Sequence, residues 1–356
     1  MRGALARGLV ASLVLMACAG SRSRPPPGGE GSGGIDVGGG GSGGDGGVPA
    51  DGGGRLCAEP TLLDSFSPQR IVYVSPAGND QADGLTEGTA WRSLVNAARL
   101  QPGDEVRLAP GRYPGGALLR GRGGPGLPIV LRASGAPGSA VLEGLGSETA
   151  LTLRGAAFVV LDGLVLTGGT DAALRLEPDE DGRAAETIQL LGVQLAQGQG
   201  ALLRARYAVD VLVQSSLFDS PETGFPQEDG RAVSLVGVRG ARLVGNVLRN
   251  VLADTAVEAR AGSSDILVDG NAFFDVQEGV SLGGRSARQE HADPLSTAEA
   301  TAVVAVNNTF VGAVAFPFVV AGCARCVVAY NSYAGAGARG AVVSRPGATG
   351  AQAPGA

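Results

Sequence analysis

Residues 265–273 read Asp-Ile-Leu-Val-Asp-Gly-Asn-Ala-Phe. Apolar side chains alternate at Ile266 and Val268, stop at Gly270 and Asn271, and return at Phe273. Alternation with a period of two is typical of a strand with one buried face, and Gly-Asn is a turn dipeptide. The stretch therefore predicts two short strands joined by a tight corner.

The same pattern recurs in seven copies, which begin at residues 158, 187, 210, 241, 265, 302 and 326. We call the corner residue the ladder position; it is Leu164, Val193, Ser216, Asn246, Asn271, Asn308 and Asn331. Successive ladder positions are 23 to 37 residues apart, and the residues five before, three before and two after are apolar in every copy. Such repeats predict a solenoid of stacked coils. Stacking should place the Asn amides in a hydrogen-bonded ladder, and we expect these Asn residues to adopt the left-handed conformation of the corner.

Composition argues against several classes of protein. The chain has 356 residues, a formal net charge of −6, one His and 28 basic residues, all of them Arg. An acidic chain without a basic stripe is not typical of a nucleic-acid binder, so we expect no nucleic-acid partner. The absence of Lys excludes any mechanism that needs a Lys base or Schiff base. No apolar run reaches the roughly 18–20 residues that span a bilayer.

The N-terminal segment carries export signals. Two Arg precede the short apolar run 9–17, which has the length of a signal peptide, and Leu15-Met-Ala-Cys18 resembles a bacterial lipobox. We expect a signal peptide over 1–18, lipid attachment at Cys18 and a disordered Gly/Pro/Ser-rich tether over 19–56. Cleavage by ordinary signal peptidase at Ala17-Cys-Ala19 is the alternative. No inner-membrane retention signal follows Cys18, so an outer-membrane anchor is favoured, on the periplasmic or the outer face.

The cysteines agree with export. With Cys18 lipidated, three remain, and an odd number cannot all pair within the chain. Cys323 and Cys326 could close a small disulfide in an oxidising compartment, and no role is assigned to Cys57. A redox CxxC motif or a zinc site is the weaker interpretation, because the chain has no second CxxC.

A stretch before the repeats also has a recognisable order. Residues 73–80 (YVSPAGND), 89–98 (TAWRSLVNAA) and 102–113 (PGDEVRLAPGRY) read as strand, turn, capping helix, turn and first coil. With the repeats, this order resembles the right-handed parallel β-helix of the pectate-lyase-like superfamily. The resemblance implies an all-β solenoid over 105–347 behind a cap region at 57–104, with a disordered tail at 348–356. It fixes activity poorly, since the superfamily includes lyases, hydrolases, epimerases and adhesins.

The cap has its own expected geometry. An amphipathic helix over 91–100 would bury one face and cover the open end of the coil. Its inward residues would be Trp91, Leu94, Val95 and Ala98. We interpret Trp91 as core packing rather than sugar stacking. A separate short α/β domain followed by a β domain is the alternative for this region.

Each coil needs a third strand, which should precede the next copy. We expect these strands at 173–176, 202–206, 232–236, 257–260, 280–283, 318–321 and 341–343. Alternation along these strands places eight polar side chains on the outer face: Arg175, Glu177, Arg204, Arg206, Ser234, Glu258, Arg260 and Ser281. The long loops 177–186, 219–231 and 285–300 lie beside the same strands, and long loops on one face usually frame a binding surface.

These outward residues are the candidate binding site. Arg175, Arg204, Arg206 and Arg260, with Glu177 and Glu258, could bind a uronic-acid polymer, because guanidinium groups pair well with carboxylates. A solvated surface ladder of ion pairs is the alternative.

Catalytic candidates are weaker. A lyase would use Arg204, Arg206 or Arg260 as its base, and His291 lies among acids in the longest loop as a possible general base. Asp179, Asp181, Glu228 and Asp229 offer oxygens that suit Ca²⁺, without an EF-hand spacing. We expect no cofactor, with Ca²⁺ as the exception that these loops allow. A hydrolase would need two carboxylates at a set separation, and no pair stands out.

Three functions remain open. The leading hypothesis is a lipid-anchored extracytoplasmic protein that binds polysaccharide or another cell-surface ligand on one sheet face. The second is a polysaccharide lyase, or less favoured a hydrolase. The third is a structural or adhesive spacer. The sequence does not fix the oligomeric state.

Overall fold

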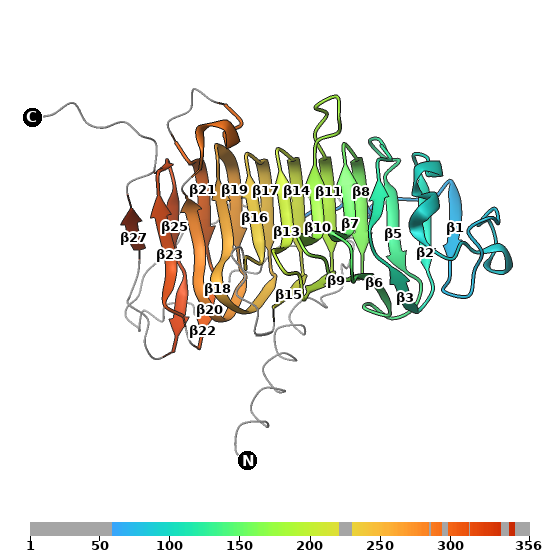
Figure 1. The fold of residues 1–356 in the computed structure, drawn as a ribbon. Coiled ribbons are helices and arrows are strands. Elements are labelled where there is room, and N and C mark those ends of the chain that lie inside the picture. Colours follow the sequence, from blue (N-terminus) through green and yellow to red (C-terminus); the bar gives the residue numbers. More distant parts are fainter. Residues whose placement is uncertain are drawn as a thin grey trace, which may run out of the picture. The chain divides into compact units, whose positions relative to one another are not determined.

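Every pairing between the named strands is parallel, and the chain winds as a right-handed parallel β-helix, as expected (Figure 1). The computed structural model describes residues 59–220, 230–284, 286–293, 298–312 and 314–335, with the backbone of the strand at 342–345. The expected segments 1–18, 19–56 and 348–356 lie outside the described residues. So do Cys18, Cys57, Glu228 and Asp229.

One wall of the solenoid is the first sheet, whose strands come just before the ladder position in each coil. It comprises β1 (Arg70–Val74), β2 (Asp104–Leu108), β5 (Ile129–Ala133), β8 (Ala157–Asp162), β11 (Glu186–Leu191), β14 (Val209–Gln214), β17 (Arg239–Val244), β19 (Ser263–Asp269), β21 (Ala300–Val306), β24 (Cys323–Ala324) and β25 (Val327–Ala329).

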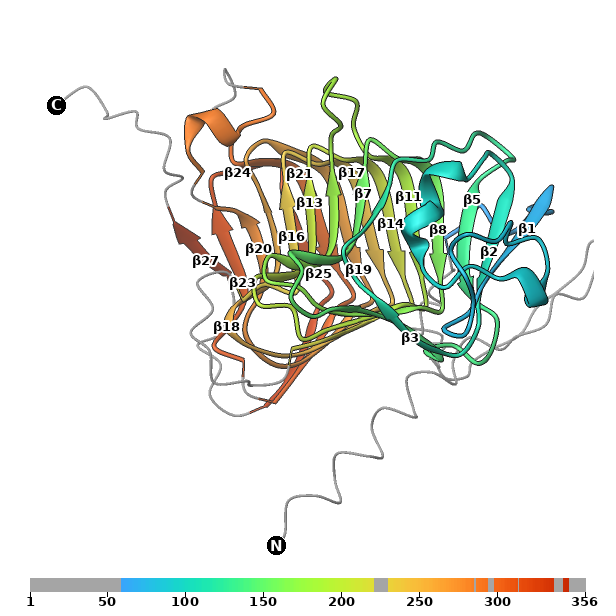
Figure 2. The same ribbon diagram turned by 45° about the vertical axis from the view of Figure 1, so that its right-hand side comes forward.

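The strands after the ladder position form a second column. It comprises β3 (Gly111–Pro114), β6 (Ala140–Gly144), β9 (Val165–Gly168), β12 (Gln194–Ala196), β15 (Leu217–Asp219), β22 (Thr309–Val311) and β26 (Ser332–Ala334). The third column comprises β4 (Ala117–Leu119), β7 (Thr149–Arg154), β10 (Ala172–Glu177), β13 (Ala201–Arg206), β16 (Val233–Val236), β23 (Phe316–Ala321) and β27 (Val342–Arg345). Two long strands, β18 (Val247–Arg260) and β20 (Ala272–Gly283), run through both columns and join them into one sheet (Figure 2).

The core follows the repeat. In the first six copies the three apolar positions are at most 1% exposed, whereas the last copy is only partly covered and Tyr333 is 38% exposed. Phe273 stacks on Phe310 of the next coil at 4.6 Å between ring centroids. Two coils, β2–β4 and β5–β7, precede the seven copies; the sequence analysis found only the first of them.

The Asn ladder is confirmed. The side-chain amide of Asn246 donates to Asn271 Oδ1 over 2.9 Å, Asn271 donates to Asn308 over 3.0 Å, and Asn308 donates to Asn331 over 2.9 Å. Each accepting oxygen also takes the backbone N–H of the preceding ladder residue. The ladder therefore gives hydrogen-bond partners to buried polar groups that would otherwise have none at the corners.

The expected conformation of the ladder residue is wrong. The left-handed backbone is found one residue earlier in all seven copies, at Gly163, Gly192, Ser215, Gly245, Gly270, Asn307 and Tyr330. A second left-handed residue lies five positions further back in each copy, as at Asp210 and Asp265. The ladder Asn serves through its side chain, and the preceding residue makes the turn.

The cap helix also differs from the expectation. Residues Leu94–Arg99 form a 3-10 helix (η2), with Ser93 as its N-cap. Because a 3-10 helix repeats every three residues, Trp91, Leu94, Ala97 and Leu100 are buried. Val95 is 69% exposed and Ala98 is exposed, so two of the four expected inward residues are wrong. Trp91 packs in the core, as expected. Two further 3-10 turns are η1 (Glu87–Thr89) and η3 (Arg288–Glu290).

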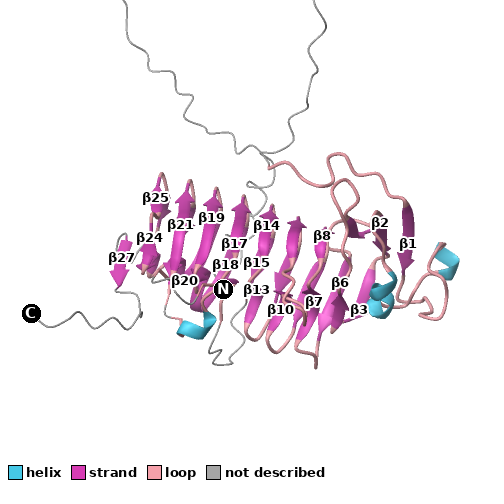
Figure 3. Ribbon diagram, turned by 90° about the horizontal axis from the view of Figure 1, so that it is seen from above, coloured by secondary structure: helices cyan, strands magenta, loops and turns pink. Residues whose placement is uncertain are grey.

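Residues 59–69, which we call the strap, run along the outer face of the first sheet towards β1 (Figure 3). Glu59 N donates to Gln214 Oε1 over 2.9 Å, and Leu62 N donates to Gln189 Oε1 over 2.8 Å. Gln189 is in register with Val160 and Leu212, which face outward and are nevertheless buried. The strap is therefore held to a part of the outer face where Val160 and Leu212 are buried.

Candidate functional site

The expected ligand-binding residues all lie on the third column. Arg175 of β10 is in register with Arg204 of β13, which is in register with Ser234 of β16. Ser234 is in register with Glu258, and Glu258 is in register with Ser281. Arg206 and Arg260 both align with Val236. The strand positions are therefore as expected, on five neighbouring rungs about 19 Å from first to last.

Two of the long loops rise from the same edge of this column. The loop after β10 and the loop after β20 both leave the C-terminal ends of third-column strands (Figure 1). The third expected loop enters the column from its other edge, before β16, and most of it lies outside the described residues.

At the first of these rungs, the carboxylate of Asp171 contacts two arginines. Its carboxylate lies 2.8 Å from Arg175 Nη2 and 3.5 Å from Arg204 Nε, and Glu148 adds a contact of 3.1 Å to Arg175. Glu177 pairs mainly with Arg154, at 2.6 Å, and is 3.8 Å from Arg175. The expected residues therefore meet here, held by carboxylates from turns that the sequence analysis did not single out.

A second cluster lies around Glu258. The carboxylate of Glu258 is 3.1 Å from both Arg231 Nε and Arg260 Nε. Burial raises the pKa of Glu258 above its usual range, although Arg231 and Arg260 partly offset the effect. Arg260 also reaches Glu290 over 2.9 Å. Burial alone would raise the pKa of Glu290, but its bond and attraction to Arg260 outweigh that and lower it.

Arg206 differs from its neighbours. It lies on β13 two residues after Arg204, half-buried, and makes no hydrogen bond or ion pair of its own within the described residues. Its charge helps to lower the pKa of Glu290. A guanidinium between two charge-paired clusters is therefore open to an added anion.

His291, the possible general base, is buried and only 6% exposed. Its Nε2 lies 3.6 Å from Glu299 Oε1, and its Nδ1 is buried without a hydrogen-bond partner in the described residues. Glu299 is fully buried and accepts from the backbone N–H groups of Ser286 and Ala261. This buried pair therefore holds the loop through contacts with Ala261 and Ser286.

The acidic loop after β10 is tied by its own contacts. Asp179 accepts from the backbone N–H groups of Asp181 and Arg183, and Asp181 pairs with Arg183 at 3.3 Å. Arg120 pairs with Glu180 of the same loop. No group of three metal-binding side chains occurs in the described part of the chain.

At the last coil, Cys323 and Cys326 are joined in a disulfide, with their Cα atoms 6.0 Å apart. Cys323 is the first residue of β24, and Cys326 lies in the short break between β24 and β25.

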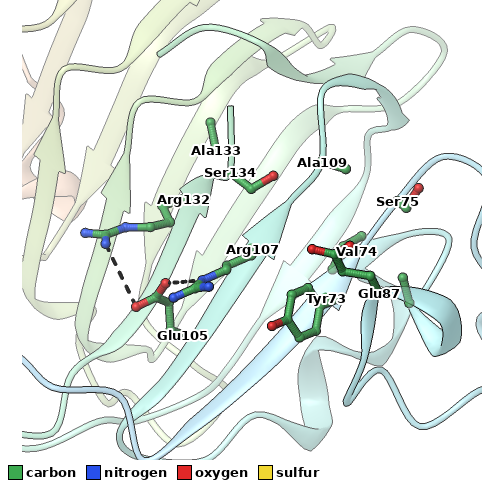
Figure 4. A pocket seen from close by; sticks show the side chains of 11 residues that line it. Tyr73, Val74, Ser75, Glu87, Glu105, Arg107, Ala109, Arg132, Ala133 and Ser134 are labelled. Carbon is green, nitrogen blue, oxygen red and sulfur yellow. Dashed lines mark hydrogen bonds and ion pairs between the residues drawn. The ribbon is translucent and has the colours of Figure 1, made fainter. Parts of the chain in front are cut away.

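A cavity of about 660 Å³ opens elsewhere, beside β1, β2 and β5 of the first sheet (Figure 4). Tyr73, Arg107 and Arg132 contribute to its floor. The sequence analysis placed Tyr73 in the cap and Arg107 and Arg132 in the solenoid, and it proposed no site there.

Comparison with known proteins supports the architecture. No protein-family model and no curated protein matches the chain. The GH136 lacto-N-biosidase from Eubacterium ramulus is similar with a TM-score of 0.51 and 14% identity, over 77% of this chain and 57% of that enzyme. This chain thus spans little more than half of that enzyme's length.

Two further solved structures are similar. The pectate lyase Pel9A has a TM-score of 0.46 and 16% identity, over 76% of this chain and 80% of that one. PfbA, a surface adhesin of Streptococcus pneumoniae, has a TM-score of 0.44 and 12% identity, over 65% and 60% of the two chains. At such identities the likeness concerns the fold alone. Among the described residues, no helix has the length and apolar character needed to cross a membrane.

Proposed function

We propose that this protein binds an acidic polysaccharide, or another anionic cell-surface ligand, along the third column. The observation that carries the proposal is Arg206, whose guanidinium lies on the binding face without a carboxylate bound to it in the described residues. Arg forks suit sugar carboxylates, and the neighbouring Arg–carboxylate pairs would order Arg206 on a rigid strand.

The charges favour binding over catalysis. A lyase base must lose its own proton before it can take one from the substrate. For Arg260, burial lowers the pKa, but Glu258 and Glu290 outweigh burial and raise it above the ordinary value. Arg204 is held near Asp171. These two candidates are therefore better suited to hold charge than to abstract a proton.

Titration of polygalacturonate by calorimetry tests the proposal. Arg206→Ala should weaken binding about tenfold, the worth of one charge-assisted contact. Arg242→Ala is the matched control, because Arg242 is half-exposed on the first sheet and, among the described residues, pairs only with Asp210. Equal affinity in the wild type and Arg206→Ala would contradict the role of Arg206, and no binding by the wild type would instead favour the spacer hypothesis. Conversion of the polymer into an ultraviolet-absorbing unsaturated product would favour the lyase.

We further propose that the protein is extracytoplasmic and held at the outer membrane by a lipid on Cys18. The lipobox-like sequence and the Gly/Pro/Ser-rich segment that follows support this. Cys18→Ser should move the protein from the membrane fraction to the soluble fraction, and Cys57→Ser should not. Unchanged partitioning of Cys18→Ser would contradict the anchor.

A further inference from the structure

The cavity on the first sheet has a floor of polar side chains in register. Tyr73 of β1 is in strand register with Arg107 of β2. Arg107 is in register with Arg132 of β5, and Arg132 with Asp162 of β8. Their neighbours in sequence, such as Val74, Leu108 and Leu131, point into the core. Alternation therefore fixes the row of polar side chains on the outer face.

The walls of the cavity come from the strand ends and the cap. Ser75 and Ser134 follow the ends of β1 and β5, and Glu87 of η1 also lines the cavity (Figure 4). The volume of about 660 Å³ is within the range of small-molecule sites. The cavity thus offers room for one or two sugar-sized units beside hydroxyl groups and one exposed carboxylate.

Each guanidinium group uses only part of its donor capacity, although a hydrogen bond with Tyr73, besides the one to Glu105, helps to raise the pKa of Arg107. Glu105, only 3% exposed, accepts from Arg107 Nε over 2.6 Å and lies 3.9 Å from Arg132 Nη1. The terminal nitrogens of Arg107 donate no hydrogen bond to a carboxylate in the described residues. Arg132 Nε is buried without a hydrogen-bond partner there, and its Nη2 lies 3.0 Å from Asp162.

A guanidinium group carries five N–H donors, more than Glu105 and Asp162 take up among the described residues. Glu105 and Asp162 hold the two guanidinium groups in place, which leaves donors for an incoming anion. Tyr73, the serine hydroxyls and Glu87 can exchange hydrogen bonds with the hydroxyl groups of the same ligand.

We propose that this cavity binds a small hydroxylated carboxylate of the size of a single uronic acid. The carboxylate lies against Arg107 and Arg132, and the hydroxyl groups face Ser75, Ser134 and Glu87. The site is on a different wall from the third column and does not depend on polysaccharide binding there.

The test is calorimetric titration of the full chain with galacturonate, and with galactose and acetate as probes that carry only one half of the chemistry. Galacturonate should bind saturably, and each partial probe at least about tenfold more weakly, the worth of one charge-assisted bond. Equal binding of galactose would overturn the role of the carboxylate, and equal binding of acetate would overturn the role of the hydroxyl groups. No saturable binding of galacturonate at millimolar concentration would overturn the site.

Two variants locate the binding. Ser134→Trp fills the cavity without changing charge and should abolish binding, whereas Ser134→Ala, its matched control, keeps the space and should retain most of it. Arg107→Gln should weaken binding about tenfold or more. Because that change leaves Glu105 with a weaker partner and could unfold the cap, Ser134→Trp is the decisive variant. Unchanged galacturonate affinity in Ser134→Trp would show that the ligand binds elsewhere.

Trigalacturonate distinguishes a free monosaccharide from a polymer end. In one outcome, Ser134→Trp loses affinity for both galacturonate and trigalacturonate while it still binds polygalacturonate through Arg206. That result would support two separate sites. Loss of polygalacturonate binding together with the small-ligand affinity would overturn the independence of the cavity.

Discussion

Asn246 and Asn271, on neighbouring coils, share one buried oxygen: Asn271 Oδ1 accepts both the backbone N–H and the side-chain amide of Asn246, each over 2.9 Å. The amide of Asn271 in turn donates to Leu243 O over 2.9 Å and to Asn308. One side chain therefore satisfies polar groups on three coils.

Asn271→Ala should lower the free energy of unfolding by about 2–4 kcal/mol, because it leaves several buried polar groups without partners. Asn331→Ala removes equivalent bonds at the partly exposed end of the ladder and should cost less, since water can replace them there. Chemical denaturation compares the two. Equal costs would contradict a ladder stabilised by burial.

Val95 and Ala97 test the 3-10 geometry of the cap. Val95→Glu should change stability by no more than about 0.5 kcal/mol, as for other surface substitutions. Ala97→Glu buries an unpaired charge and should lower the melting temperature sharply or prevent folding. If Val95→Glu proves the more damaging, the helix is an ordinary α-helix with the face first expected.

Tyr113 should ionise at a higher pH than a free tyrosine. Its hydroxyl donates to Ala109 O over 2.6 Å, and burial raises its pKa to about 12. Since the fold favours the neutral phenol, its contribution to stability is complete below the ordinary pKa of about 10 and is lost as the pH rises towards about 12. Ultraviolet titration of the wild type and Tyr113→Phe should differ by one late transition. A difference at the ordinary pH of tyrosine ionisation would refute it.

Glu258 and Glu290 should titrate on opposite sides of the usual carboxyl range. The raised pKa of Glu258 means that its stabilising contribution is present below the unfolded pKa and is lost as the pH rises through the folded pKa. The lowered pKa of Glu290 means the reverse, with stability lost as the pH falls through the folded pKa. Carbon-detected NMR of the two carboxyl groups measures both. The reverse order of titration would show that Arg260 chiefly neutralises Glu258.

Glu299 should anchor the loop after β20. Glu299→Ala removes the acceptor of two backbone N–H groups and should cost about 1–3 kcal/mol for each buried donor left without a partner. Limited proteolysis should then cut near residues 286–293 sooner than in the wild type. Glu148→Ala, which removes a largely exposed carboxylate, serves as the control. A cleavage rate equal to the control would mean that the loop is held by other contacts.

The sequence predicts the place of a residue well when that place is decided within its own coil. Ile266, Val268 and Phe273 were placed correctly because alternation along one strand decides which side is buried. The left-handed residue was misplaced by one position. Asn tolerates a left-handed backbone, but Gly270, directly before Asn271, adopts it without steric cost.

The candidate site depends on partners from other coils. Asp171 lies one coil before Arg204 along the chain, and only the stacking of the coils brings the two side chains together. The row of Tyr73, Arg107 and Arg132 was missed for the same reason, because the first coils lack the ladder motif that aligned the later ones.

The strap gives the solenoid a mechanical asymmetry. A pull on the chain ahead of Glu59 enters at β14, near the middle of the stack, and acts across the coils. The bonds to Gln214 and Gln189 would then carry the load one after another, as in peeling, before any force reached β1. Under tension the molecule would give way first along its flank, and the coils would be shielded until the strap had lifted.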